Sequence, residues 1–343
     1  MEKILFLAHT ETDGALPKVA REALSAALEL CRGIPGATLT VGLVGGEVKG
    51  AAEALAGCGA GAFLAVSGAD FAVSRYATDV AAVEALARRT EATLIVAPTT
   101  ARLSRALPGA AQRLQGRIET HVCGLSAADG QPQVQRWYYR QRMVATQTRT
   151  QRPWFLVVDG GVFPGWQGAP GAAALEELAV TIGDDGRRTR VIGIQSPAAD
   201  AQTIRPEADV LFVAGAGWTK KQADGQLHMQ EAADLILGFL GRHSASLGSS
   251  KSLVDQSVEG GAVLSFMSHM NQVGQTGSTP RHPKGLATCC HGEEPHAVGW
   301  RFINERRAIN MDAGCGWSQG KADVLYVADA FAVMRRVNEL LAG

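Results

Sequence analysis

The sequence predicts an α/β protein with two domains, each built on a largely parallel sheet. Short, continuously apolar runs alternate with amphipathic segments, as in parallel strands that helices cover on both faces. This pattern is interrupted by one long polar segment, residues 183–209. The chain has 343 residues, which is long enough for two hydrophobic cores.

In the first half, apolar runs rich in β-formers are separated by stretches with helical spacing. The expected strands are 3–9, 38–44, 62–66 and 93–100, and the expected helices are 18–32 and about 77–89, with a further short segment at 51–55. Two later runs, 134–141 and 154–161, are expected to complete or flank the same sheet.

The polar segment places the domain boundary, giving domains 1–198 and 199–343. In the second domain, residues 208–221 are predicted to form a strand, a glycine turn and the approach to a helix. Residues 226–243 are predicted to form an amphipathic helix, and residues 322–343 a strand followed by a helix. Pro280 and Pro283 are expected to end any helix or central strand near them.

The composition argues against several classes of protein. Lysine plus arginine number 33, equal to aspartate plus glutamate, so the chain lacks the basic footprint of a nucleic-acid binder. It has no apolar run of membrane-span length, so no direct membrane insertion is expected. The six cysteines form no C-x-x-C pair, which favours reduced thiols in a cytoplasmic protein and makes a metal site improbable.

Several short motifs follow one another in the second domain. The order is VAGAG (213–217), GSSKSLVD (248–255), QVGQTG (272–277), H-x4-H (291–296), AIN-x-D (308–312) and VAD (327–329). Taken alone, a glycine turn after a strand is as often a simple corner as a phosphate-binding turn. A Ser/Lys turn is more often a solvated loop. The motifs gain weight from their order.

In that order the motifs resemble the alpha subunit of electron-transfer flavoproteins, whose pattern reads GASRAAVD and then QVGQTGK. The resemblance is specific over roughly the last 130 residues and architectural over the first half. It implies an N-terminal parallel-sheet domain of nucleotide-hydrolase-like architecture and a C-terminal doubly wound FAD-binding domain.

The resemblance also implies a set of flavin contacts. Val273 to Thr276 would line the isoalloxazine, and His296 would donate toward its O2 edge. Ser250 and Asn310 would contact the phosphate and ribityl-adenosine portions, and Asp329 would lie near the adenosine end. The full set of implied FAD-binding residues is Ala216, Ser250, Lys251, Gln272, Val273, Gly274, Gln275, Thr276, His291, Gly292, Glu293, Glu294, Pro295, His296, Asn310 and Asp329.

By the same resemblance, the chain would pair with an electron-transfer flavoprotein beta subunit that carries AMP or a second nucleotide. The pair would take electrons from a flavin dehydrogenase or demethylase and pass them to a quinone-linked acceptor. The flavin supplies the redox chemistry, so the chain needs no acid, base or nucleophile of its own. No Ser-His-Asp or paired-carboxylate arrangement is evident in the sequence.

The chain departs from the family pattern at four places. Ala216 replaces an arginine expected near the pyrophosphate, and Lys251 replaces a flavin-facing arginine, which keeps the charge but loses the planar fork. Glu293, Glu294 and Pro295 stand beside the implied flavin, and residues 258–268 form an insertion. These departures indicate a divergent member.

Two other functions remain open from the sequence. A nucleotide-binding scaffold subunit that has lost functional FAD would explain Ala216 and Lys251, although the intact QVGQTG and His296 oppose it. An independent enzyme that uses a nicotinamide cofactor is opposed by the missing acid/base arrangement. An absorbance spectrum of the purified complex separates the three functions.

Overall fold

The computed structural model divides the chain into two compact units, Met1–Ile194 and Gln195–Gly343. It describes residues 1–138, 143–193, 204–205, 208–243, 245–255, 261–274, 278, 280–288, 300 and 303–343. The boundary predicted between residues 198 and 199 lies outside these described residues. The predicted α/β class, with a large and mainly parallel sheet, is confirmed.

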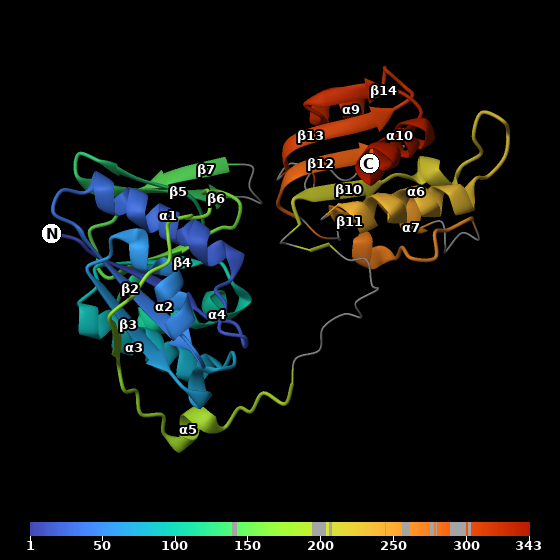
Figure 1. Ribbon diagram of the computed structural model, residues 1–343. Helices are drawn as coiled ribbons and strands as arrows, with labels where there is room; N and C mark the ends of the chain where they lie inside the picture. Colours follow the sequence, from blue (N-terminus) through green and yellow to red (C-terminus); the bar gives the residue numbers. More distant parts are fainter. Residues whose placement is uncertain are drawn as a thin grey trace. The chain divides into compact units, whose positions relative to one another are not determined.

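The described strands of the first unit form one sheet in the order β7-β6-β5-β8-β4-β1-β2-β3-β9 (Figure 1). The strands are β1 (Lys3–His9), β2 (Thr38–Gly45), β3 (Ala62–Ser67), β4 (Leu94–Pro98), β5 (Arg117–Ala128), β6 (Gln131–Tyr138), β7 (Met143–Gln147), β8 (Trp154–Val158) and β9 (Leu175–Glu177). The pairs β5–β6 and β6–β7 are antiparallel, and the other neighbours are parallel. β8 lies inside the sheet, between β4 and β5, so it completes the sheet rather than flanking it.

Helices cover both faces of this sheet, as the apolar strands predict. α1 (Lys18–Gly33) and α2 (Lys49–Leu55) pack into one core, and α3 (Tyr76–Thr90) and α4 (Ala101–Arg113) pack into the other. The short α5 (Asp184–Arg187) follows β9. Within the described residues the strands and the two longer helices expected in this half are confirmed, whereas α4, β5, β7 and β9 were not foreseen.

The described strands of the second unit form a parallel sheet in the order β11-β10-β12-β13-β14 (Figure 1). The strands are β10 (Val210–Ala214), β11 (Ala245–Ser249), β12 (His282–Thr288), β13 (Ile303–Asn310) and β14 (Val324–Val327). The chain adds β11 on one side of β10 and then β12, β13 and β14 on the other. This reversal of direction makes the sheet doubly wound.

β12 corrects one sequence-based expectation. Pro283 is the second residue of β12, a central strand that pairs with both β10 and β13, so the prolines do not exclude a central strand here. The paired register with β10 starts only at Lys284, after the proline. A proline is tolerated where a strand begins, because its missing N–H interrupts no ladder bond there.

The helices of the second unit divide between the two faces of its sheet. α6 (Met229–Arg242) and α10 (Ala330–Ala342) pack into one core through Phe239 and Phe331, and α7 (Lys251–Asp255) adds Leu253 to it. On the other face, α9 (Gly316–Lys321) contributes Trp317. The insertion at 258–268 is anchored in the first of these cores by Leu264, which is buried.

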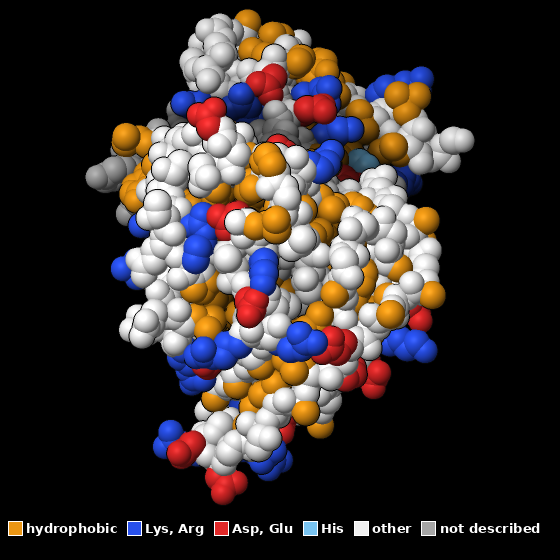
Figure 2. Space-filling view, turned by 90° about the vertical axis from the view of Figure 1, so that its left-hand side faces the viewer, with side chains coloured by type: hydrophobic (Ala, Val, Ile, Leu, Met, Phe, Trp, Pro, Cys, Tyr) orange, Lys and Arg blue, Asp and Glu red, His pale blue; other side chains and the backbone are white. Residues whose placement is uncertain are grey.

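The surface agrees with the balanced composition. On the face shown in Figure 2, Lys and Arg side chains are interspersed with Asp and Glu side chains. Within the described part of the chain, no helix is both long enough and apolar enough to cross a membrane.

Candidate functional site

The described residues that the sequence predicts as cofactor contacts gather where the strands of the second sheet end. Ala216 follows β10 by two residues, Ser250 follows β11 directly, Asn310 ends β13 and Asp329 follows β14 by two residues. The carboxyl ends of parallel strands share one edge, and ligands of doubly wound sheets bind there, beside the point where strand order reverses. That point lies between β10 and β12.

The start of the QVGQTG loop is joined to this edge by backbone contacts. Gln272 forms an isolated parallel bridge with Ser249, and the Val273 N–H donates to the Ser249 carbonyl at 3.0 Å. Gly274 then takes a left-handed φ of 83° and donates its N–H to the Ser278 carbonyl at 2.7 Å. The loop therefore pairs with the end of β11 at one position and then turns back at Gly274. A residue with a Cβ would disfavour the left-handed backbone of that turn.

Two buried polar atoms at this edge have no hydrogen-bond partner among the described residues. They are Ser249 Oγ, in a residue that is 0% exposed, and Gln272 Nε2, in a residue that is 3% exposed. Buried polar groups of folded proteins are nearly always hydrogen-bonded, so this pair retains the capacity to hydrogen-bond a bound polar group. The donor chemistry of this edge fits the flavin that the sequence implies.

Ser250 and Lys251 begin the short helix α7. The Ser250 Oγ accepts a hydrogen bond from the Leu253 N–H at 3.3 Å. Lys251 Nζ lies 3.5 Å from Asp255 Oδ2, and His269 Nε2 lies 2.8 Å from Asp255 Oδ1. The His269 hydrogen bond, followed by the Lys251 charge, lowers the pKa of Asp255. Lys251, which stands at the position of the family arginine, therefore pairs its ammonium group with Asp255 of the same helix.

The glycine turn after β10 is a packed corner. Ala216 is fully buried at the start of a short 3-10 turn, η3 (Ala216–Thr219), while α6 begins only at Met229. Trp218 Nε1 donates to Thr288 Oγ1 at 2.8 Å, which ties this turn to the end of β12. A phosphate-binding turn leads directly into a helix whose N-terminal N–H groups face the phosphate. Because α6 begins only at Met229, the geometry favours a simple connecting turn.

Asn310 and Asp329 each hold local backbone in place. Asn310 Oδ1 accepts from the Asp312 N–H at 3.0 Å, shaping the turn after β13. Asp329 is the N-cap of α10, with Oδ1 accepting from the Phe331 N–H at 3.1 Å. Asp and Asn are preferred at N-caps because their side chains satisfy an otherwise unpaired helix N–H.

The remaining implied contacts fall outside the part of the chain that the structure describes. They are Gln275, Thr276, His291, Gly292, Glu293, Glu294, Pro295 and His296. Their roles remain predictions. Ser249, by contrast, lies in the described part and was not among the predicted site residues; it stands where the family pattern GASRAAVD has alanine.

The first sheet also carries polar side chains at its carboxyl edge. His9 Nε2 lies 3.0 Å from Thr100 Oγ1, and the Thr99 hydroxyl donates to Asp159 Oδ1 at 3.2 Å. His121 Nδ1 lies 3.4 Å from Asp159 Oδ2. The first contact joins the end of β1 to the residues after β4, and the other two join residues after β4 and in β5 to Asp159 after β8.

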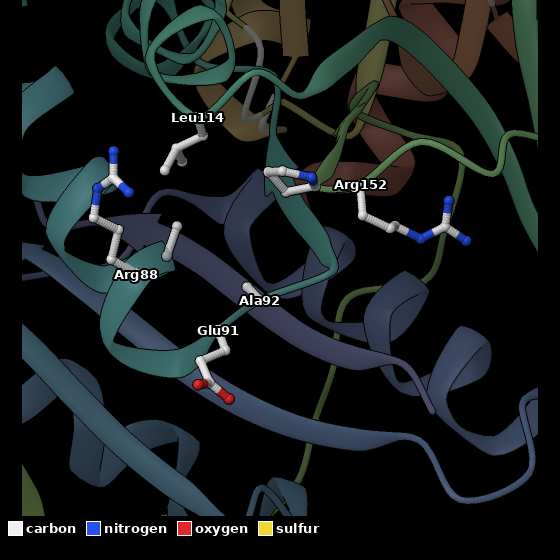
Figure 3. Close-up of a pocket in the computed structure, with 7 residues that line it drawn as sticks. Arg88, Glu91, Ala92, Leu114 and Arg152 are labelled. Atoms are coloured by element: carbon white, nitrogen blue, oxygen red, sulfur yellow. The ribbon is translucent and has the colours of Figure 1, made fainter.

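A hollow of about 390 Å³ lies at the opposite, amino edge of the first sheet, between the end of α3 and the start of β8. Figure 3 shows the Arg88 and Arg152 side chains pointing away from one another there. Arg88 pairs with Glu84, Arg152 with Glu2, and Glu91 with Lys3. Because this edge is not where doubly wound sheets bind ligands and its charges are paired, we do not assign it a site.

The chain is thus an α/β protein of two units, the second with a doubly wound sheet that gathers polar side chains at its carboxyl edge. Residues 4–182, more than half of the chain, match the model of the electron transfer flavoprotein domain. The chain belongs to this family. The search of curated proteins yields no relative that matches it.

The position of this match corrects one part of the sequence analysis. The resemblance was specific in the last 130 residues and only architectural in the first half, yet residues 4–182 lie entirely in the first unit. The first unit therefore carries a family signal that the motif comparison did not detect.

Proposed function

We propose that this chain is the alpha-type subunit of a heterodimeric electron-transfer flavoprotein and binds one FAD within residues 199–343. The observation that carries the proposal is the gathering of Ser250, Gln272, Val273 and Asn310 at the carboxyl edge of a doubly wound sheet. Membership of the electron transfer flavoprotein family supports a flavin as the bound group.

Within this proposal, the residues of the chain bind and orient the cofactor. Bound FAD supplies the chemistry of accepting and releasing electrons. The Val273 N–H holds the loop against β11 through the Ser249 carbonyl, and the Gly274 N–H closes the turn onto the Ser278 carbonyl. The Ser250 hydroxyl, which accepts from the Leu253 N–H, keeps its proton to donate to the cofactor. Gln275, Thr276 and His296 complete the ring contacts by resemblance.

The proposal includes partners. Members of this family typically pair with partner subunits, so we assign the chain a beta-type subunit with AMP or a second nucleotide. A flavin dehydrogenase or demethylase donates the electrons, and a quinone-linked acceptor receives them. Cys31 and Cys58 carry free thiols, which supports the cytoplasm as the location.

A second candidate is a scaffold subunit of a redox complex that keeps the fold without functional FAD. Two observations favour it. Ala216 lies in a packed corner with no charge of its own, and Lys251 is paired with Asp255. Both reduce the positive charge available to a pyrophosphate.

The test is co-expression of the chain with a beta-like partner, followed by an absorbance spectrum and anaerobic addition of a reduced flavin dehydrogenase. The proposal predicts one FAD per heterodimer, bleaching of the flavin band by the donor, and recovery of the band with a quinone-linked acceptor. A stable heterodimer without flavin would instead establish the scaffold function.

A further inference from the structure

We propose that Ser249 is a cofactor-binding residue. Its hydroxyl and the Gln272 side-chain amide form a pair of neutral hydrogen-bond donors for an uncharged acceptor of the flavin, a ring carbonyl or ring nitrogen. This inference rests on the proposed function and adds a contact that the motif comparison did not predict.

The backbone fixes the two residues side by side. Ser249 ends β11 and forms the isolated bridge with Gln272, held by the Val273 N–H on the Ser249 carbonyl at 3.0 Å. Side chains alternate along a strand, so Ser249 shares a face with Leu247, and Val273 lies on the opposite face with Val213. Paired positions project to the same face, which places the Gln272 side chain beside that of Ser249.

Both side chains end in an atom without a partner. Ser249 Oγ and Gln272 Nε2 are shielded from solvent and make no hydrogen bond to any described residue. Leaving a buried donor unsatisfied costs free energy, so their conjunction at a ligand-binding edge is best explained by a group that arrives with the cofactor.

Ser246 provides the contrast on the same strand. It is equally buried at 0%, but its hydroxyl accepts from the Arg205 N–H at 2.7 Å and lies 2.9 Å from both the Arg205 carbonyl and His282 Nε2. A buried serine in β11 is therefore not unpartnered as a rule. The unpartnered serine is the one at the carboxyl end.

The surroundings select a neutral acceptor over a phosphate. The face that carries Ser249 packs the core that includes Leu247, Trp218 and Leu253. Lys251, two residues beyond Ser249, is directed to Asp255 at 3.5 Å. A phosphate requires cations or several backbone N–H groups, whereas a hydroxyl and an amide suffice for a carbonyl or ring nitrogen.

The experiment compares Ser249→Ala with the matched control Ser246→Ala in the purified heterodimer. It measures the FAD dissociation constant by flavin fluorescence and the denaturation midpoint of the protein stripped of flavin. We expect Ser249→Ala to raise the FAD dissociation constant about tenfold, because one hydrogen bond to the cofactor is lost. The denaturation midpoint of the flavin-free protein should stay unchanged or rise, because the variant removes an unpartnered hydroxyl. Ser246→Ala should lower that midpoint and leave the dissociation constant unchanged.

Gln272→Met, which keeps the length of the side chain without its amide, should weaken FAD binding in the same way. The double variant should lose less than the product of the two single effects, because both atoms serve one acceptor. An unchanged dissociation constant in Ser249→Ala, or a midpoint lowered as in Ser246→Ala, would overturn this inference alone. Failure of the wild-type heterodimer to bind FAD would overturn the proposed function and this inference with it.

Discussion

At the scale of single residues, burial of His9 is the feature of the first unit with the clearest consequence in solution. The residue is 4% exposed at the end of β1 and shares a hydrogen bond with Thr100. Burial, assisted by the Arg102 charge, lowers the pKa of His9 from 6.5, although the Thr10 carbonyl and the Glu11 and Asp79 charges oppose the shift. The folded chain therefore holds this imidazole neutral where the unfolded chain protonates it.

We predict that His9 makes the first unit less stable in mild acid. Between the lowered folded pKa and the unfolded value of 6.5, the unfolded state binds more protons, so the free energy of unfolding falls as the pH falls. Urea unfolding of the wild type and of His9→Asn at a series of pH values measures this. The variant should show a shallower loss of stability below pH 6.5, and equal slopes in the two proteins would contradict the prediction.

At the scale of the helix, Asp329 combines a structural role with a predicted cofactor contact. It caps α10, whose Phe331 packs 4.6 Å, ring centre to ring centre, from Trp218 in the turn after β10. The cap thus helps to hold the helix that supports the edge of the sheet. In a variant that loses the cap, weaker FAD binding could therefore result either from a less stable helix or from the lost contact with FAD.

We predict that Asp329→Ala destabilises the second unit by about 1 kcal/mol, the usual value of an N-cap. Asp329→Asn should retain the stability, since asparagine caps as well as aspartate. Denaturation of both variants measures the cap, and FAD affinity of the asparagine variant measures the contact separately. If alanine and asparagine destabilise the unit equally, the cap does not contribute as described.

The sequence predicts elements well where burial alone decides them. Strands such as 3–9 and the helix at 226–243 follow from apolar periodicity, and the structure confirms them. α4 contains Pro108, which removes a helix N–H donor, and β12 (HPKGLAT) has few β-formers, so local propensity conceals both. An added Cβ at Gly285 in β12 would lie 2.7 Å from Ile303 Cγ2 and 2.9 Å from the Trp300 ring, contacts that no local pattern reveals.

The candidate site is less predictable, because it depends on which residues from distant segments of the chain lie together at the carboxyl edge of the second sheet. Resemblance supplied Gln272 and Asn310, and the strand order, together with the bridge from Gln272 to Ser249, brings them to one edge. The packed corner at Ala216, the pairing of Lys251 with Asp255 and the unpartnered hydroxyl of Ser249 all depend on register and burial. These three properties become visible only once neighbouring segments are placed in space.

At the scale of the whole molecule, each unit has hydrophobic cores of its own. Two such units are expected to unfold as separate cooperative transitions. A ligand that binds only one folded unit stabilises that unit, by about 2.7 kcal/mol when its concentration is 100 times its dissociation constant.

We therefore predict that FAD raises the midpoint of one transition and leaves the other unchanged. Scanning calorimetry of the flavin-free and flavin-loaded chain measures the two midpoints, and Asp329→Ala identifies the transition of the second unit. A FAD-induced shift of the transition that Asp329→Ala leaves unaffected would place the cofactor in the first unit and contradict our assignment.

The most direct test of the FAD site is photolabelling of the heterodimer with an azido analogue of FAD, followed by peptide mapping. We predict labelled peptides within residues 208–343, in segments that follow strand ends such as that of β11, and loss of the label with excess FAD. Label confined to residues 1–194 or to the partner subunit would contradict a flavin site at the carboxyl edge of the second sheet.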